Sequence, residues 1–356
     1  MRAILLTLAL AAITSAALAA PAEVRERKDG AGVIYADAQD RTLYTYAQDK
    51  PGKSLCNDVC ARAWPPLIAP GDAKSDAAWS AIARDDGKKQ WALNGRPVYI
   101  FAKDLPGTSF GEGAGNLAWR VAMTPIFTPP GVTQRQSVLG RILIDRGGHT
   151  LYRRTDGKPC TAKCLEDWMP LIAPLAAKAK GDWTMVARDD GARQWAYRGQ
   201  VLYTYTRDSR PGEIEGHGRD KAWQAAVLSP AAGEPAWVTI QGTDMGEVFA
   251  DATGRTLYVA PAGLDQARKL MCDQACLDAA FTAVAATDTD KNLGDWSVVT
   301  RDGKKLWAYK GDAVFTHSRD RKPGEVGGDR WLVGTGLTSA GGGYQPVMRP
   351  TAETLP

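Results

Sequence analysis

Residues 79–101 read WSAIARDDGKKQWALNGRPVYIF, and this stretch places two turn signals between short apolar runs. Asp86-Gly87 and Asn94-Gly95 are turn dipeptides, because Asp, Asn and Gly tolerate the positive φ that tight hairpin turns require. The sequence therefore predicts a three-stranded meander. Its strands would be Trp79 to Arg84, Gln90 to Leu93 and Pro97 to Phe101.

The same pattern recurs twice further along the chain. Trp91, Trp195 and Trp307 are separated by steps of 104 and 112 residues, and the first cysteines of three Cys-x-x-x-Cys pairs are separated by the same steps. Each of these tryptophans thus lies 35 residues after the first cysteine of its own copy. A fixed period of this kind indicates tandem modules. The pairs are Cys56/Cys60, Cys160/Cys164 and Cys272/Cys276.

The later copies keep the other landmarks of the first. Equivalent turns stand at Asp190-Gly191 with Arg198-Gly199, and at Asp302-Gly303 with Lys310-Gly311. Upstream, Val33 to Asp37 and Thr42 to Tyr46 predict a further hairpin. Each module is expected to close on a tryptophan after a glycine-rich loop. These closing residues are Trp119, Trp223 and Trp331.

One short helix is expected beside each cysteine pair. Cys56, Cys60 and Trp64 lie at i, i+4 and i+8, and Pro65 would end the helix. The fold class is therefore mainly β, with three tandem small β-rich modules that each contain meander hairpins and one short helix carrying a Cys-x-x-x-Cys pair. We expect the boundaries 1–19 for a signal peptide, 20–129, 130–230 and 231–339 for the modules, and 340–356 for a flexible tail.

The N-terminus predicts export. An apolar run from Ala3 to Leu18 follows Arg2 and ends on the small-residue pattern Ala17-Leu18-Ala19, which is typical of a secretory signal cleaved near Ala19-Ala20. The run is shorter than a bilayer span, so no transmembrane anchor is expected. The formal net charge is +4 with both signs interspersed, which does not favour a nucleic-acid partner. The location is predicted as periplasmic or secreted.

A short motif of the form Tyr-x-[Phe/Trp/Tyr]-x-x-Asp recurs in the chain. The first module has it twice, at residues 44–49 and 99–104, and the second module has it at residues 203–208. The chain resembles the bacterial family of secreted repeat and predicted lipoprotein-like proteins that carry this motif, a resemblance that implies no settled activity. The residues of the motif are Tyr44, Tyr46, Asp49, Tyr99, Phe101, Asp104, Tyr203, Tyr205 and Asp208, with the altered copy Phe315 and Asp320.

Two interpretations of the motif and of the repeated tryptophans remain open. Alternating aromatic residues followed by Asp fit a β-strand with one buried face that ends in a turn. Alternatively, the aromatic rings form a platform for a ligand. Trp91, Trp195 and Trp307 are likewise expected in the core or in cross-strand packing, with a binding platform as the alternative.

The six cysteines admit three roles. In an exported protein two cysteines per module favour intramodule disulfides. On a regular helix, residues four apart have Cβ atoms about 5–6 Å apart, whereas a disulfide needs about 3.8 Å, so the turn must be distorted. Thiol redox chemistry and Cu(I) binding are the alternatives. No other metal or cofactor is expected, because His149, His217 and His317 occupy three different places in the repeat.

Two functions of different classes follow from these observations. The first is a non-catalytic exported repeat protein that serves structurally or binds a small ligand or an envelope protein, because no convergent catalytic set is evident. The second is a periplasmic redox, electron-transfer or copper-handling protein that uses the three cysteine pairs. No catalytic residues are assigned, and the sequence leaves the oligomeric state open.

Overall fold

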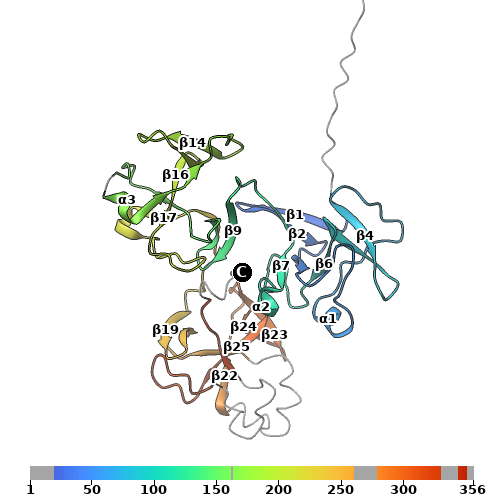
Figure 1. Cartoon of the computed structure of the whole chain (residues 1–356). Helices are drawn as coiled ribbons and strands as arrows, with labels where there is room; N and C mark the ends of the chain where they lie inside the picture. The colour runs from blue at the N-terminus through green and yellow to red at the C-terminus, as the bar shows by residue number, and fades with distance from the viewer. Residues whose placement is uncertain (1–19, 162, 260–278, 330–343, 351–356) are drawn as a thin grey trace, which may run out of the picture.

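Three β-rich lobes surround a common centre and follow one another along the chain (Figure 1). The structure is a computed structural model that describes residues 20–161, 163–259, 279–329 and 344–350. We call the lobes module 1 (residues 20–129), module 2 (residues 130–230) and module 3 (the described residues from 231 to 350). The predicted mainly β fold in three repeats is confirmed.

Module 1 contains two antiparallel sheets, with strand orders β1-β2-β8 and β4-β5-β6-β3-β7. The predicted meander is present as β4, β5 and β6. The elements are β1 (Val24–Asp29), β2 (Gly32–Asp37), β3 (Leu43–Tyr46), α1 (Asp58–Ala63), β4 (Trp79–Ala83), β5 (Lys89–Leu93), β6 (Arg96–Ile100), α2 (Ala114–Leu117), β7 (Trp119–Val121) and β8 (Met123–Pro125).

Module 1 is itself a pair of half-repeats with the same order of elements. Strands β1, β2 and β3 precede α1 and Trp64, and strands β4, β5 and β6 precede α2 and Trp119. The inner strands β3 and β6 pair antiparallel, with Tyr44 opposite Tyr99. After each tryptophan the chain crosses to the other half, because β7 pairs with β3 and Pro66 bridges to Tyr99. Each half therefore completes the sheet of the other.

Modules 2 and 3 repeat this plan with losses. In module 2 the orders are β18-β10-β9 and β13-β15-β16-β11-β17, with β14 also paired to β15 and β12 to β16, and in module 3 they are β19-β20 and β23-β24-β25-β21-β26, with β22 paired to β25. Module 2 contains β9 (Val132–Ser137), β10 (Gly140–Asp145), β11 (Tyr152–Arg154), α3 (Cys164–Asp167), β12 (Trp168–Pro170), β13 (Ile172–Ala173), β14 (Trp183–Ala187), β15 (Arg193–Tyr197), β16 (Gln200–Tyr205), the 3-10 turn η1 (Arg219–Lys221), β17 (Trp223–Ala225) and β18 (Val227–Pro230). Module 3 contains β19 (Thr239–Thr243), β20 (Gly246–Ala250), β21 (Leu257–Val259), β22 (Phe281–Ala283), β23 (Trp296–Arg301), β24 (Lys304–Tyr309), β25 (Asp312–His317) and β26 (Gln345–Pro346).

The Asp-Gly turns differ from the prediction in two of the three modules. At Asn94-Gly95 both residues have positive φ, as expected. In the turns at 84–88 and 188–192, however, only Gly87 and Gly191 do. These turns are one residue longer, because Arg84 N donates to Lys88 O, so Gly alone takes the left-handed position. Module 3 has the shorter turn, and there Asp302 and Gly303 both have positive φ.

The expected upstream hairpin and the cysteine helix are corrected. Strand β2 pairs with β1 and β8, and it meets the start of β3 only at the single bridge between Ala36 and Thr42. Helix α1 begins at Asp58, so Cys56 lies before it, and α3 begins at Cys164. The chain enters α1 from an extended Asn57. This break from helical geometry brings the two cysteines of the pair together.

Tyr344 occupies the closing position that the sequence assigned to Trp331 in module 3. Its ring stacks on Phe281 at 3.6 Å between centroids, as Trp119 stacks on Trp64 at 3.8 Å. Val347 N donates to Leu257 O, and Ala122 N donates to Leu43 O in the same way. The assignment of the closing position was therefore wrong, and Trp331 itself lies outside the described residues.

The expected module boundary at residue 339 and the flexible tail are corrected for the same reason. Residues 344–350 belong to module 3, since β26 pairs with β21 and Tyr344 and Val347 are buried. The aromatic residue comes 24 residues after Asp320 in module 3 but 15 residues after Asp104 in module 1. Because of this longer spacing, module 3 ends later in the sequence than predicted.

The modules contact one another through specific pairs. Ala31 of module 1 is buried in the core of module 2, and Gln134 Nε2 donates to its carbonyl oxygen at 3.0 Å. Module 1 meets module 3 through the ion pair of Lys103 and Asp312 at 2.7 Å. Helices long and apolar enough to cross a membrane are absent from the described residues.

Candidate functional site

A buried tyrosine–aspartate pair is repeated in all three modules. The hydroxyl of Tyr44 donates to Asp104 Oδ2 at 2.6 Å, and the equivalent pairs measure 2.6 Å and 2.7 Å. The other oxygen of each carboxylate accepts a backbone N–H of the loop that follows, such as Phe110 N at 2.9 Å. We call this arrangement the Tyr–Asp clamp. Its members are Tyr44 and Asp104, Tyr152 and Asp208, and Tyr258 and Asp320.

The clamp fixes the glycine-rich loop against the aromatic core. Gly111 N donates to the hydroxyl oxygen of Tyr44, and Gly216 N does the same with Tyr152. A Cβ atom on Gly111 would lie 2.6 Å from the ring of Trp64, so only glycine fits there. The Asp of the motif therefore holds a loop in place.

Burial changes the ionisation of the clamp carboxyls. It raises the pKa of Asp104 to about 7 and that of Asp208 to about 6, although the hydrogen bonds from tyrosine and the backbone act in the opposite direction. Burial also raises the pKa of Asp320. All three carboxyls are almost inaccessible to solvent. Each clamp therefore contains a buried carboxyl group whose pKa is raised.

Module 1 has a second clamp related to the first by the half-repeat symmetry. The hydroxyl of Tyr99 donates to Asp49 Oδ2 at 2.8 Å, and Leu55 N donates to Asp49 Oδ1 at 2.7 Å. The two motifs of module 1 thus exchange partners, each tyrosine binding the aspartate of the other motif. In module 2 the corresponding position is Gly157, so this second clamp is lost.

The remaining aromatic residues of the motif pack around the stacked pair. Tyr46 stacks on Trp119 at 4.4 Å, Phe101 contacts Trp64 at 4.5 Å, and Tyr205 contacts Trp168 at 4.6 Å. His317 takes the same place against Phe281 at 4.7 Å. Phe315 replaces the second tyrosine and lies opposite Tyr258. The motif rings belong to the core of each module.

The repeated tryptophans Trp91, Trp195 and Trp307 form the second part of each core. Each is at most 5 % exposed and makes a ring contact with a neighbouring tryptophan. The structure thus places them in packing positions. The cysteines pack against the clusters of the clamp tyrosines: Cys56–Cys60 and Cys160–Cys164 are disulfides with Cα atoms 5.2 Å apart. Cys272 and Cys276 lie outside the described residues.

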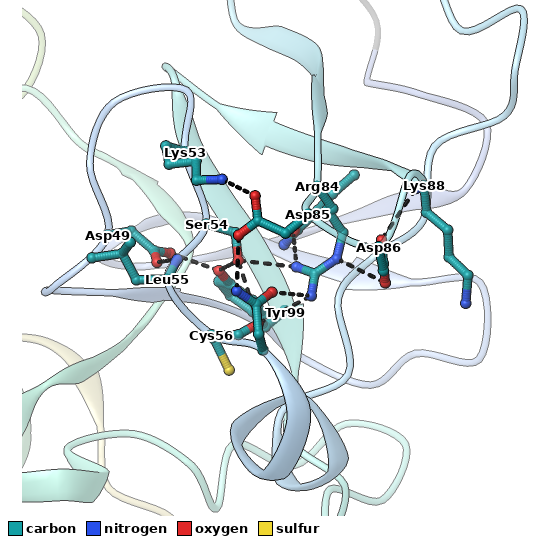
Figure 2. Close-up of polar contacts among 12 residues, drawn as sticks. Asp49, Lys53, Ser54, Leu55, Cys56, Arg84, Asp85, Asp86, Lys88 and Tyr99 are labelled. Carbon is teal, nitrogen blue, oxygen red and sulfur yellow. Dashed lines mark hydrogen bonds and ion pairs between the residues drawn. The ribbon is translucent and has the colours of Figure 1, made fainter.

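An arginine buried beside the first disulfide organises the loop that carries it (Figure 2). Arg84 Nη2 donates to Cys56 O at 3.0 Å and to Asn57 Oδ1 at 3.1 Å. Its Nη1 donates to Ser54 Oγ at 2.9 Å and to Gln90 Oε1 at 2.6 Å. Lys53 pairs with Asp85 at the edge of the same cluster. The guanidinium therefore ties the loop 53–57 to the meander.

The arginine at this position should contribute more to the free energy of unfolding in module 1 than in module 2. Arg84→Lys is expected to lower the free energy of unfolding by about 2 kcal/mol, because a lysine cannot reproduce the planar fork. Arg188 keeps bonds only to Asp190 and Gln194, so Arg188→Lys should cost less than about 1 kcal/mol. Urea unfolding of both variants tests this. Equal losses would contradict the difference in roles.

A cavity of about 740 Å³ lies where the three modules meet. Module 1 contributes the loop 106–109, module 2 contributes 136–139 and Pro230, and module 3 contributes 231–234 together with Phe249, Trp296 and Tyr309. Polar groups at its wall include Asn292 and Asp295. The cavity therefore depends on all three modules.

The motif supports this cavity indirectly. Gly107 N donates to Asp40 O, Thr42 Oγ1 donates to Thr108 O at 2.5 Å, and Asp104 accepts from Phe110 N, so the loop 106–109 is held at both ends by module 1. The sequence interpretation did not include the cavity residues or Arg84. Arg84 and Gln90, repeated as Arg188 and Gln194, gave a usable signal; the cavity gave none, because its wall residues come from unrelated loops.

These features define the chain as a repeat protein of intertwined half-repeats that are held by buried Tyr–Asp clamps. Three of its segments, residues 23–68, 80–123 and 184–227, match a family described as a secreted repeat of unknown function. These segments are therefore repeats of that family, and the resemblance seen in the sequence is confirmed. Each match spans one half-repeat, so the family unit is half a module. No curated protein and no solved structure matches the chain.

Proposed function

We propose that this protein is a non-catalytic exported scaffold that binds a small ligand in the cavity between its three modules. The observation that carries the proposal is that the cavity wall comes from all three modules. If the three modules acted independently, a site formed by all of them together would not be expected. Its volume of about 740 Å³ falls in the range typical of small-molecule sites.

The lining suggests the chemistry of the ligand. Tyr309 supplies aromatic surface, with Phe249 and Trp296, which are 2 % and 1 % exposed, packed behind the wall, and Ser109 and Gln136 supply hydrogen-bonding groups. Burial and the nearby negative charges of Asp295 and Glu234 raise the pKa of Tyr309, so its hydroxyl stays a neutral donor. We expect a small organic molecule with an apolar or aromatic body and a polar edge.

The environment of the clamp carboxyls supports a non-catalytic role. Asp104 and its equivalents are ionisable groups of raised pKa, a property that often marks catalytic acids. Each is nevertheless buried and satisfied by a tyrosine and a backbone N–H. A substrate atom has no access to these carboxyls, so their arrangement favours packing over catalysis.

Filling the cavity should abolish ligand binding. The mature protein, purified from the exported fraction, is analysed by native mass spectrometry for a bound mass and by thermal shift against amino acids, sugars and nucleotides. Ala231→Trp, in the cavity wall, is expected to remove the bound mass or shift. Ala77→Trp, at an exposed site of module 1, should leave both unchanged.

Two outcomes would count against the proposal. If no probe and no co-purifying molecule binds the native protein, the cavity has no ligand of these classes. If binding persists in Ala231→Trp, the ligand sits elsewhere. The melting temperature of each variant shows whether it is folded.

The redox or copper-handling alternative rests on the cysteine pairs. In the described chain both pairs are disulfides, and Cu(I) needs the reduced thiolates. Thiol titration and metal analysis of natively purified protein distinguish the two functions. Free or metal-loaded thiols would favour the alternative, and six blocked thiols without metal would exclude it.

A further inference from the structure

Module 2 exposes a face that module 1 covers with its own chain. In module 1, Ile68 and Ile82 both pair with Gln90, and Ser54 and Cys56 are bonded to Arg84 on the Ile82 side of this row, where Ile82 is buried. In module 2 the same row exists. Ile172 and Val186 both pair with Gln194, and Arg188 Nη1 donates to Gln194 Oε1 at 3.0 Å.

The sequence explains why the cover is missing. Cys56 comes 12 residues after Tyr44, but Cys160 comes only 8 residues after Tyr152. The shorter connection lacks the length that carries Lys53 to Asn57 across the meander in module 1. Arg154 Nη1 instead holds Pro159 O at 3.1 Å, which keeps the short loop near its own strand.

Equivalent side chains are more exposed in module 2, where the covering loop is missing. Val186 is 45 % exposed, whereas the equivalent Ile82 is 9 % exposed; Ile172 and its equivalent Ile68 are both exposed, so the loss of cover falls on Val186. The side chain of Arg188 is 17 % exposed, against 2 % for Arg84. Within the described chain, Arg188 Nη2 has no acceptor, although Arg84 Nη2 has two. The face thus combines exposed apolar side chains with the Nη2 donors of Arg188, which have no acceptor among the described residues.

The two modules also differ in the pairing of an aspartate beside this face. Lys53 of the covering loop pairs with Asp85 in module 1. The equivalent Asp189 is exposed, and no described residue pairs with it. A segment that took the place of the covering loop would therefore meet the carboxylate of Asp189 and the Nη2 group of Arg188, both of which lack a partner among the described residues.

We propose that the face formed by Ile172, Val186, Arg188, Asp189 and Gln194 binds an extended peptide segment of a partner protein. The segment places a lysine on Asp189, a hydroxyl side chain on Arg188 Nη1 and a backbone carbonyl on Arg188 Nη2, as Lys53, Ser54 and Cys56 do in module 1. This site is separate from the cavity between the modules, so the two proposals stand or fall independently.

The test uses the mature full chain and a labelled peptide with the sequence of residues 51–57, carrying Cys56→Ser. Fluorescence anisotropy should show saturable binding. Arg188→Gln is expected to weaken it at least tenfold, because it removes the charged donors. Asp189→Asn, and Lys53→Glu in the peptide, should each weaken it severalfold at low salt. Arg207→Gln, at an exposed arginine of the same module, should leave it unchanged.

A loop graft provides an independent variant. Replacing residues 153–160 by residues 45–56 restores the covering segment in cis, and binding of the peptide should be lost while the protein stays folded. No saturable binding up to millimolar peptide would overturn the proposal. Unchanged binding by Arg188→Gln or by the folded graft would also overturn it, since the peptide would then occupy another surface.

Discussion

Tyr344→Ala is expected to lower the free energy of unfolding of module 3 by about 3–5 kcal/mol, the usual cost of removing a large buried aromatic side chain. Tyr344 is 2 % exposed and stacks on Phe281 at 3.6 Å, and its ring also meets Phe315 edge-on at 5.4 Å. The alanine would leave a cavity beside both rings. It would also weaken the attachment of β26 to β21.

Hydrogen exchange with mass spectrometry can assign this loss to module 3. Protection of β21 and β25 should fall in Tyr344→Ala, while protection of β11 and β16 in module 2 stays unchanged. Trp223→Ala, at the equivalent position of module 2, should give the reverse pattern. If Trp331→Ala destabilised module 3 as strongly and Tyr344→Ala did not, the closing position assigned to Tyr344 would be wrong.

The sequence predicted the module order because local signals determine it. Turn dipeptides and alternating apolar residues specified the meander, and the constant spacing from cysteine to tryptophan fixed its register. The exchange between half-repeats was missed. The stack of Trp64 on Trp119 joins residues that are 55 positions apart, and no local pattern reports such a contact.

The role of the motif was left open by the sequence because it depends on the partner of Asp. A carboxylate after a strand can cap a turn, bind a ligand or accept from a distant hydroxyl. The structure shows that Asp104 accepts from Tyr44, which is 60 residues earlier in the chain. The occurrence of the motif twice in module 1 was the available clue, because two equivalent strands that pair can exchange partners.

Differences among the modules suggest where specialisation is tolerated. The described clamps that fix a glycine-rich loop are present in all three modules, whereas the second clamp, the covering loop and the full set of bonds to the buried arginine in module 1 are not repeated in module 2. In module 3, Leu306 replaces the glutamine of the network. The clamps maintain each fold, and the surfaces around them vary.

The clamp carboxyls should make module 1 less stable as the pH rises. The pKa of Asp104 in the folded protein is about 7, above the ordinary value of about 3.9 that an unfolded chain has. Between these values the folded state keeps a proton that the unfolded state releases. Stability from this group is therefore complete below about pH 4 and is lost as the pH rises through 7.

Asp104→Asn isolates this effect from the other carboxyls. Asparagine resembles the protonated acid, since its oxygen can accept from Phe110 N while its amide donates to Tyr44. Relative to the unchanged protein, the variant should gain about 2–4 kcal/mol between pH 4.5 and pH 7.5. Urea unfolding followed by tryptophan fluorescence measures the difference. Asp85→Asn is the control, because the bond from Lys53 lowers the pKa of Asp85, so this carboxyl is ionised in both the folded and the unfolded state over this pH range and the stability difference of the variant should stay almost constant; a parallel trend in both variants would rule out the clamp as its source.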